Sequence, residues 1–397
     1  MLRIALKMLL GDRAKYAGLL FGITFTSFLV TFAASYFTGF MTRGFAVIAE
    51  NPGADVWVMD PAVESPEQTA NVPMSALYRV RSIEGVSSAV PLALGTAETR
   101  LPNGRIQPFQ VVGVDDATLV GVPLLRGHLS PAVLRDPDAV VVDPGGTEGK
   151  LETPLLSKDR WPYEGPHLAV PTRLLQDGDE LLVNDHRVVV KGLAEALPRF
   201  PPRPLLYTTF SNAGRILLPE RHRLTFVLAT AAPGLTARDL AARIAARTGL
   251  KARASADFKA DTVRWFLVTS EDVGDIAAML TLAMSVGFGV AGVMLYMFTT
   301  ENLKQYAVLK AMGATSRLLL AMIFAQAGVC ALLGTGFGLG LCGVIGQLAS
   351  DAGYPFRMMW FTPLIGTVMV LLVSVVAAAI SVRPVLRLES AVVFAGR

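Results

Sequence analysis

Four long stretches of this chain contain no Asp, Glu, Lys or Arg, and they span residues 16–42, 276–300, 318–350 and 358–382. Each is longer than the roughly 20 apolar residues that a helix needs to cross the hydrocarbon core of a bilayer. Within lipid, only helices and closed barrels pair all of their backbone polar groups, and continuous apolar runs favour helices. We therefore predict a membrane protein with four transmembrane helices.

The basic residues outside these stretches predict the orientation of the chain. Lys and Arg outnumber Asp and Glu in three segments, 1–15, 301–317 and 383–397. Four spans place these segments on one side of the membrane, and the positive-inside rule assigns that side to the cytoplasm. We expect a multi-pass membrane protein with both termini cytoplasmic. The same rule accounts for the net charge of +4 without nucleic-acid binding.

The cytoplasmic ends have distinct expected roles. Residues 1–15 alternate apolar and basic positions and predict an amphipathic helix at the membrane surface. Residues 383–397 form a basic cytoplasmic tail.

The region between the first two spans, 43–275, is soluble in character, and this orientation places it outside the cytoplasm. Two parts of it repeat the order strand, helix, glycine, strand, with the glycines at Gly85 and Gly249. We interpret these parts as halves of one α+β domain, with Thr236 capping the second helix.

Two further segments of this region have their own signals. The segment at about 117–220 holds thirteen of the 24 prolines and predicts an inserted subdomain rich in strands and loops. The amphipathic segment 261–272 predicts a helical stalk that continues into the second span.

Several catalytic motifs are missing from the sequence. The nearest candidate for a phosphate-binding loop ends at Lys150, but Pro144 and Leu151 stand where that loop needs Gly and Ser or Thr. We therefore expect a non-catalytic chain that has no cofactor of its own and does not hydrolyse ATP itself. The four histidines lack the spacing of metal ligands, so no metal site is predicted. The spans carry no charged residue, which disfavours an ion-coupled carrier.

The third apolar stretch contains two overlapping GxxxG patterns. Small residues at this spacing let two helices approach closely. The contact is either between helices of this chain or between two subunits, and the sequence leaves both open. The glycines concerned are Gly334, Gly336, Gly338 and Gly340.

The only loop between spans on the cytoplasmic side is 301–317. Good helix formers run to Met312, and Gly313 is a natural left-handed stop. A short rigid helix here would carry force from a partner into the membrane, although a simple connector remains the alternative. Lys304 and Lys310 are candidates to meet acidic groups of the partner, and Tyr306, Val308 and Met312 to fill an apolar groove. The full set of candidate coupling residues is Glu301, Lys304, Gln305, Tyr306, Val308, Lys310, Met312 and Gly313.

Residues 305–315, QYAVLKAMGAT, resemble the segment that follows the second span in the FtsX/MacB-type ABC transporter permeases. Residues 4–16 and 382–394 are similar to the same family. An acidic residue is usual in the broad family where Gln305 stands here, and the Gln305-Tyr306 pair looks more like the DevC-like branch.

The resemblance implies a homodimer with a MacB-like periplasmic domain and a separate ABC ATPase bound below the membrane. It further implies a periplasmic adaptor (a membrane-fusion protein) and a TolC-like outer-membrane duct. Such a permease transmits ATP-driven motion to its exported domain and exports a lipid-like, peptide or hydrophobic substrate. The alternative is an FtsX-like regulator that activates an exported partner, such as a cell-wall hydrolase, without transport.

Overall fold

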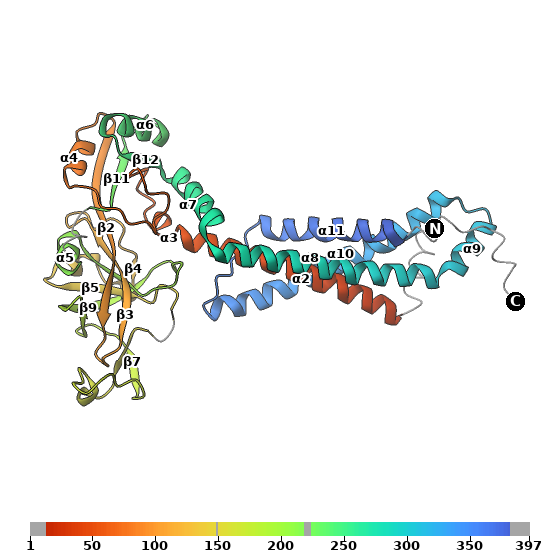
Figure 1. Cartoon of the computed structure of the whole chain (residues 1–397), viewed down its shortest axis with the longest axis horizontal. Coiled ribbons are helices and arrows are strands. Elements are labelled where there is room, and N and C mark those ends of the chain that lie inside the picture. Colours follow the sequence, from red (N-terminus) through yellow and green to blue (C-terminus); the bar gives the residue numbers. More distant parts are fainter. Residues whose placement is uncertain (1–12, 148–149, 218–223, 382–397) are drawn as a thin grey trace. The chain divides into compact units, whose positions relative to one another are not determined.

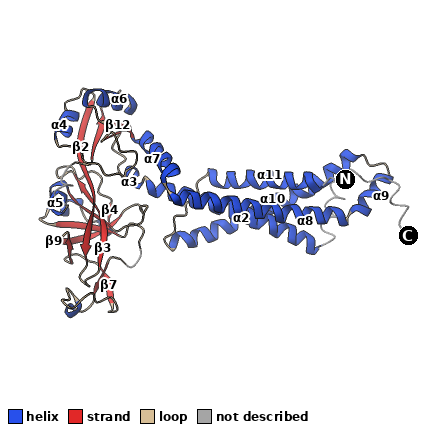
Figure 2. Ribbon diagram, in the orientation of Figure 1, coloured by secondary structure: helices blue, strands red, loops and turns tan. Residues whose placement is uncertain are grey.

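The computed structural model describes residues 13–147, 150–217 and 224–381. The chain divides into two compact units (Figure 1), a helical unit of Met1–Phe40 and Glu271–Arg397 and a sheet unit of Met41–Ser270. All described strands belong to the sheet unit (Figure 2). The predicted fold class, four apolar helices and a large α+β domain, is confirmed. Apart from residues 13–15, the expected amphipathic helix and the basic tail lie outside the described residues.

Four helices of the helical unit are long and apolar enough to cross a membrane, with mean hydropathy from 1.8 to 2.6. They are α2 (Arg13–Gly44), α8 (Glu271–Glu301), α10 (Ser316–Asp351) and α11 (Phe361–Ser381). The predicted first three spans lie within α2, α8 and α10. The fourth helix begins later than the predicted residue 358. Pro363 lies in its first turn, where a missing backbone N–H costs nothing and the fixed φ favours a helix start.

Helix α2 packs closely against the other three long helices. Glycines on these helices lie so near α2 that an added Cβ would approach its side chains to between 2.1 and 2.7 Å. The pairs are Gly287 of α8 with Thr26, Gly334 of α10 with Ile23, and Gly366 of α11 with Thr31. Small residues therefore set the spacing of the helices throughout the helical unit.

The sheet unit contains a ten-stranded sheet in the order β12-β1-β11-β2-β3-β10-β5-β9-β4, and β8 pairs with both β2 and β9. A separate pair is β6-β7. The strands are β1 (Val56–Met59), β2 (Val86–Arg100), β3 (Ile106–Val114), β4 (Leu124–Leu125), β5 (Ala139–Asp143), β6 (Glu152–Pro154), β7 (Thr172–Leu174), β8 (Glu180–Val183), β9 (His186–Glu195), β10 (Leu205–Thr209), β11 (Phe226–Ala231) and β12 (Lys251–Ala254). The helices are α3 (Ala46–Ala49), α4 (Ser75–Arg81), α5 (Phe210–Ile216), α6 (Ala237–Thr248) and α7 (Ser255–Thr269).

The two predicted strand–helix–strand segments, β1-α4-β2 and β11-α6-β12, interleave in one sheet. Strand β1 lies between β12 and β11, and β11 pairs in turn with β2, all antiparallel. This is the split βαβ arrangement of ferredoxin-like folds. Gly85 and Gly249 have φ of +98° and +69°, and the Thr236 side chain accepts the Asp239 N–H at the start of α6. The interpretation as two halves of one domain agrees with this pairing.

Among the described strands of the expected inserted subdomain at about 117–220, β6 and β7 pair with each other, and the others join the ten-stranded sheet. Strand β10 runs parallel to β3, with Leu205 opposite Gln110, and β5 and β9 extend the same sheet. Tyr207 and Val141 from this segment share a core with Trp57. High proline content correctly indicated loops, but it carries no information on which strands pair.

Helix α7 does not continue into the second span as the stalk prediction required. It ends at Thr269, and Ser270 adopts an extended backbone with φ −86° and ψ 126°. Helix α7 is instead held by aromatic packing within the sheet unit. The ring of Phe258 lies 5.7 Å from that of Trp57, and the ring of Phe266 lies 6.1 Å from that of Phe200.

A buried charged network lies near the start of the sheet unit. The guanidinium of Arg199, which is 2% exposed, pairs with the Glu50 carboxylate and donates to the Tyr207 hydroxyl at 3.0 Å. The Tyr207 hydroxyl donates to Glu50 at 2.9 Å, and the Leu197 N–H donates to Glu50 at 2.7 Å. These bonds connect Glu50, just after α3, to Arg199, which lies 149 positions later in the chain.

Candidate coupling site

The segment between α8 and α10 folds as the short helix α9 (Leu303–Ala311). A single residue, Asn302, separates α9 from α8, and its φ of −87° and ψ of 6° turn the chain. The Asn302 carbonyl accepts the N–H groups of Gln305 and Tyr306 at 3.0 and 3.1 Å. The first turn of α9 is therefore fastened directly to the end of a long helix.

Gly313 ends α9 in a Schellman motif. Its φ is +97°, so the predicted left-handed conformation is confirmed. The Gly313 N–H donates to the Lys310 carbonyl, and the Ala314 N–H donates to the Leu309 carbonyl, both at 3.0 Å. Leu309 and Ala314 also pack against the same apolar cluster, which is the hydrophobic contact that accompanies this motif. The direction in which the chain leaves α9 is thus fixed by hydrogen bonds and packing together.

Tyr306 faces inward, and its predicted role in a partner's groove is wrong. It is fully buried against Leu319, Met322 and Ile323 of α10. Its hydroxyl donates to Gln326 Oε1 at 3.0 Å. Burial raises the pKa of Tyr306 to about 12, so the hydroxyl keeps its proton at neutral pH. Tyr306 fastens α9 to α10.

Gln326 is the residue that sequence reasoning missed. It is 2% exposed, and the residues of α10 on either side of it, 318–334, are otherwise apolar. A buried amide requires a hydrogen-bonding partner, so a Gln in an uncharged span was a usable signal. The sequence alone did not show that this partner is Tyr306.

The opposite face of α9 is exposed. Val308 and Met312 are 46% and 71% exposed, and Lys304 and Gln305 are also exposed, as is Glu301 at the end of α8. Lys310 is only half-buried and lies toward the side that packs on the helical unit. The structure therefore divides the candidate coupling residues into a buried anchor, Tyr306, and an exposed face of mixed charge and apolar character. We call the exposed set, Glu301, Lys304, Gln305, Val308 and Met312, the outer face.

The two predicted GxxxG patterns behave differently. Gly334 and Gly338 are buried against α2, and a Cβ on Gly338 would lie 2.5 Å from Ser27 Cβ. Gly336 and Gly340 are exposed, and an added Cβ would meet nothing within 4 Å. The first pattern is therefore a contact between helices of this chain. Within the described residues, no His, Cys, Asp and Glu side chains gather as a metal-binding group.

Helix α9 is attached firmly at both of its ends. α9 is joined to α8 by one residue, fastened to α10 by a buried hydrogen bond, and ended by a defined motif. Helix α9 is thereby rigidly connected to two long helices.

Comparison with known proteins finds a family model that matches part of the chain. Residues 277–390, which include α9, match the family model described as FtsX-like permease C-terminal. The predicted resemblance to FtsX-type permeases is confirmed for this part of the chain, whereas the DevC-like branch stays a prediction. No curated protein matches the chain in sequence.

Two solved structures are similar to part of the chain. The periplasmic region of MacB from Actinobacillus actinomycetemcomitans has a TM-score of 0.36 and 11% identity, over 52% of this chain and 92% of that chain. The extracellular domain of the noncanonic ABC-type transporter YknZ from Gram-positive bacteria has a TM-score of 0.32 and 13% identity, over 51% of this chain and 98% of that chain.

Proposed function

We propose that this chain, whose residues 277–390 form an FtsX-like permease C-terminal domain, is the membrane permease subunit of an ABC-type exporter. In this proposal a separate ATPase binds the outer face of α9 and hydrolyses ATP. Its motion passes through α9 into α8 and α10 and from there to the sheet unit outside the cytoplasm.

The attachment of α9 is the observation that supports this proposal. A loop that only connected two spans would need neither the buried Tyr306–Gln326 hydrogen bond nor the Schellman motif at Gly313. Both features keep the short helix rigid, and Lys304, Gln305, Val308 and Met312 of the outer face are exposed to a partner.

The finer parts of the proposal concern the other partners. We propose a homodimer of the DevC-like type that works with a periplasmic adaptor and a TolC-like outer-membrane duct. The substrate class is a lipid-like, peptide or hydrophobic molecule. An FtsX-like regulator of a cell-wall hydrolase would use the same coupling helix, so the nature of the exported partner decides between the two functions.

The coupling role is tested with variants of the outer face. Val308→Asp places a charge on an exposed apolar contact point, and Lys304→Glu reverses an exposed charge. We expect both variants to insert and fold normally, and to lose capture of the co-purifying ATPase and its permease-dependent stimulation of ATP hydrolysis. The control is Thr315→Ser, an exposed and conservative change just outside α9.

Normal capture and stimulation by both variants, at wild-type expression, would refute the coupling role of this helix. Hydrolysis by the purified chain without any co-purifying protein would refute the assignment as a non-catalytic subunit. Co-purification with a cell-wall hydrolase in place of an adaptor would select the regulator over the exporter.

A further inference from the structure

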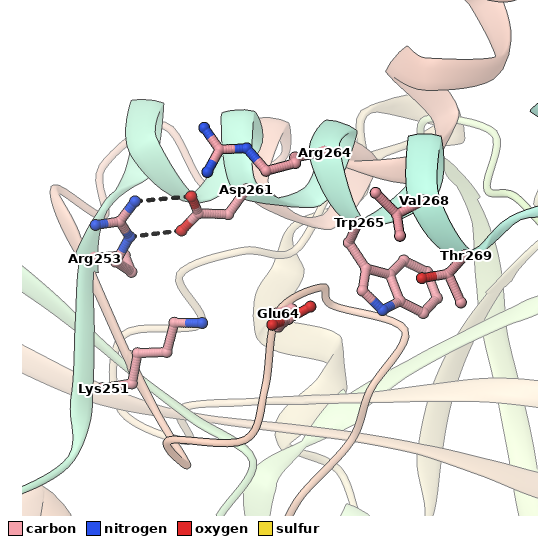
Figure 3. Close-up of a pocket in the computed structure, with 8 residues that line it drawn as sticks. All are labelled: Glu64, Lys251, Arg253, Asp261, Arg264, Trp265, Val268 and Thr269. Atoms are coloured by element: carbon pink, nitrogen blue, oxygen red, sulfur yellow. Dashed lines mark hydrogen bonds and ion pairs between the residues drawn. The ribbon is translucent and has the colours of Figure 1, made fainter.

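A cavity of about 490 Å³ lies between α7, β12 and the loop that follows β1 (Figure 3). Charged side chains and an indole line it from these three elements. They are Glu64 on the loop, Lys251 and Arg253 on β12, and Asp261, Arg264 and Trp265 on α7.

One wall of the cavity is held by internal bonds. Arg253 Nε and Nη2 donate to the two carboxylate oxygens of Asp261 at 2.6 and 2.8 Å. Lys251 Nζ donates to the Val63 carbonyl at 2.6 Å, which still leaves two of its three N–H donors. Figure 3 shows the paired Arg253 and Asp261 at one end and Trp265 at the other. The cavity therefore has a preformed shape.

Two charged side chains of the lining, Glu64 and Arg264, form no bond that holds them in place within the described residues. The Glu64 carboxylate and the Arg264 guanidinium make no side-chain hydrogen bond or ion pair with any residue that the structure describes. Trp265 projects from α7 toward the loop that carries Glu64 (Figure 3). The face of an indole attracts cations, and the Glu64 carboxylate adds a negative charge to the lining of the same cavity. The cavity thus offers a cation-binding corner, while Arg264 and Lys251 offer donors for an anion.

The position of α7 in the chain points to the source of the ligand. Thr269 ends α7, and the membrane-spanning candidate α8 begins at Glu271. Near this junction Val268 is 83% exposed and Leu267 is 49% exposed. Exposed apolar side chains and a Trp this close in sequence to a span are typical of the membrane–water interface.

We propose that this cavity binds the headgroup of a zwitterionic phospholipid that carries a primary amine, such as phosphatidylethanolamine. Arg264 and Lys251 receive the phosphate, because charge-assisted N–H donors favour phosphate oxygens. Glu64 and Trp265 receive the ammonium. The acyl chains pack along the exposed Val268, at the end of α7 that precedes α8 in the chain. The proposal rests on α8 crossing the membrane and is independent of the energy source.

The test measures lipid binding to the full-length chain in detergent by native mass spectrometry. The probes are short-chain phosphatidylethanolamine, phosphatidylcholine and phosphatidylglycerol, and soluble phosphoethanolamine. We expect the ethanolamine lipid to bind most tightly. Choline has no N–H to donate to Glu64, the glycerol headgroup has no cation, and soluble phosphoethanolamine has no acyl chain to pack on Val268.

The variants locate the site. Arg264→Ala and Glu64→Gln should each weaken binding of the ethanolamine lipid about tenfold, because each removes one charge-assisted contact. The matched control is Arg247→Ala, which removes an exposed arginine of α6 outside the cavity and should leave binding unchanged.

Three results would overturn the proposal. Equal binding of the ethanolamine lipid by all variants would show that the lipid does not bind in this cavity. Tighter binding of phosphatidylglycerol would indicate an anionic-lipid surface, and equal binding of soluble phosphoethanolamine would indicate a soluble ligand. Variants of the outer face of α9 should not change these affinities, so failure here is separable from failure of the coupling proposal.

Discussion

The hydrogen bond between Tyr306 and Gln326 joins two elements through one polar pair in apolar surroundings. We predict that Tyr306→Phe lowers the free energy of unfolding by about 1–3 kcal/mol, because it leaves the buried Gln326 acceptor without this donor. The double variant Tyr306→Phe/Gln326→Leu should lose less than the sum of the two single variants, since either single change already breaks the shared hydrogen bond. The measurement is a double-mutant cycle on the unfolding of the purified chain in detergent. Additive losses in the double variant would show that the pair contributes no coupling.

The buried network around Arg199 makes a second prediction at the residue scale. Burial raises the pKa of Glu50 and of Glu67 above the usual 4.5, and the positive charge of Arg199 opposes that rise at both. We predict that Arg199→Met destabilises the protein by about 3–5 kcal/mol at neutral pH, because it leaves the buried Glu50 carboxylate without its paired cation.

The pH dependence of this variant follows from the direction of those shifts. A carboxyl whose pKa is raised by folding contributes stability below its unfolded pKa and loses that contribution as the pH rises through its folded pKa. The deficit of Arg199→Met should therefore shrink on acidification from about pH 7.5 to about pH 5, as Glu50 and Glu67 take up protons. Denaturant unfolding at both pH values measures it. Arg187→Met, which removes a cation from an exposed pair with Glu180, is the control and should stay close to wild type. A deficit that is constant or grows at the lower pH would contradict the prediction.

Some single residues were predictable because local chemistry alone determines them. Gly313 and Thr236 end or begin helices in the predicted manner, since a left-handed stop and a side-chain cap depend only on neighbouring residues. Tyr306 was assigned to the wrong face. The apolar residues of α9 are spread around the whole helix. Periodicity within nine residues therefore does not tell which side is buried.

At the scale of elements, the four long helices were predictable and their contacts were not. Length and lack of charge identify a span, but two overlapping GxxxG patterns on one helix leave the buried one undetermined. The structure assigns the contact with α2 to Gly334 and Gly338. For the sheet too, the elements were predictable from the sequence and their pairing was not. Local patterns located β1, β11 and their helices, whereas the parallel pairing of β10 with β3 depends on contacts between distant segments.

The glycines of α10 give a prediction at this scale. Gly338→Ala should lower the melting temperature of the purified chain, because the new Cβ would lie 2.5 Å from Ser27 Cβ and 2.7 Å from the Thr24 carbonyl oxygen. Backbone atoms cannot move aside as a flexible side chain does. Gly336→Ala is the matched control on the same helix, since its Cβ would meet nothing within 4 Å and alanine favours the helix. Equal effects of the two variants would mean that α10 does not pack on α2 through this face.

At the scale of the whole molecule, the proposed function requires the sheet unit and α9 to lie on opposite sides of the membrane. The four long helices are consistent with this topology, because α9 lies between α8 and α10 whereas the sheet unit lies between α2 and α8. One span therefore separates the two regions along the chain. The excess of Lys and Arg in 301–317 predicts that α9 is the cytoplasmic one.

Cysteine labelling in intact spheroplasts tests this orientation. Ser157 in the sheet unit and Ser316 after α9 are both exposed, so a cysteine at either position can react with a thiol reagent. The native Cys330 and Cys342 are buried in α10 and give a low background. We expect a membrane-impermeant reagent to label Ser157→Cys but not Ser316→Cys, and to label both once the membrane is permeabilised. Labelling of Ser316→Cys alone in intact spheroplasts would show that the chain has the opposite orientation. The outer face of α9 would then be out of reach of any cytoplasmic ATPase, and the coupling proposal would fail with it.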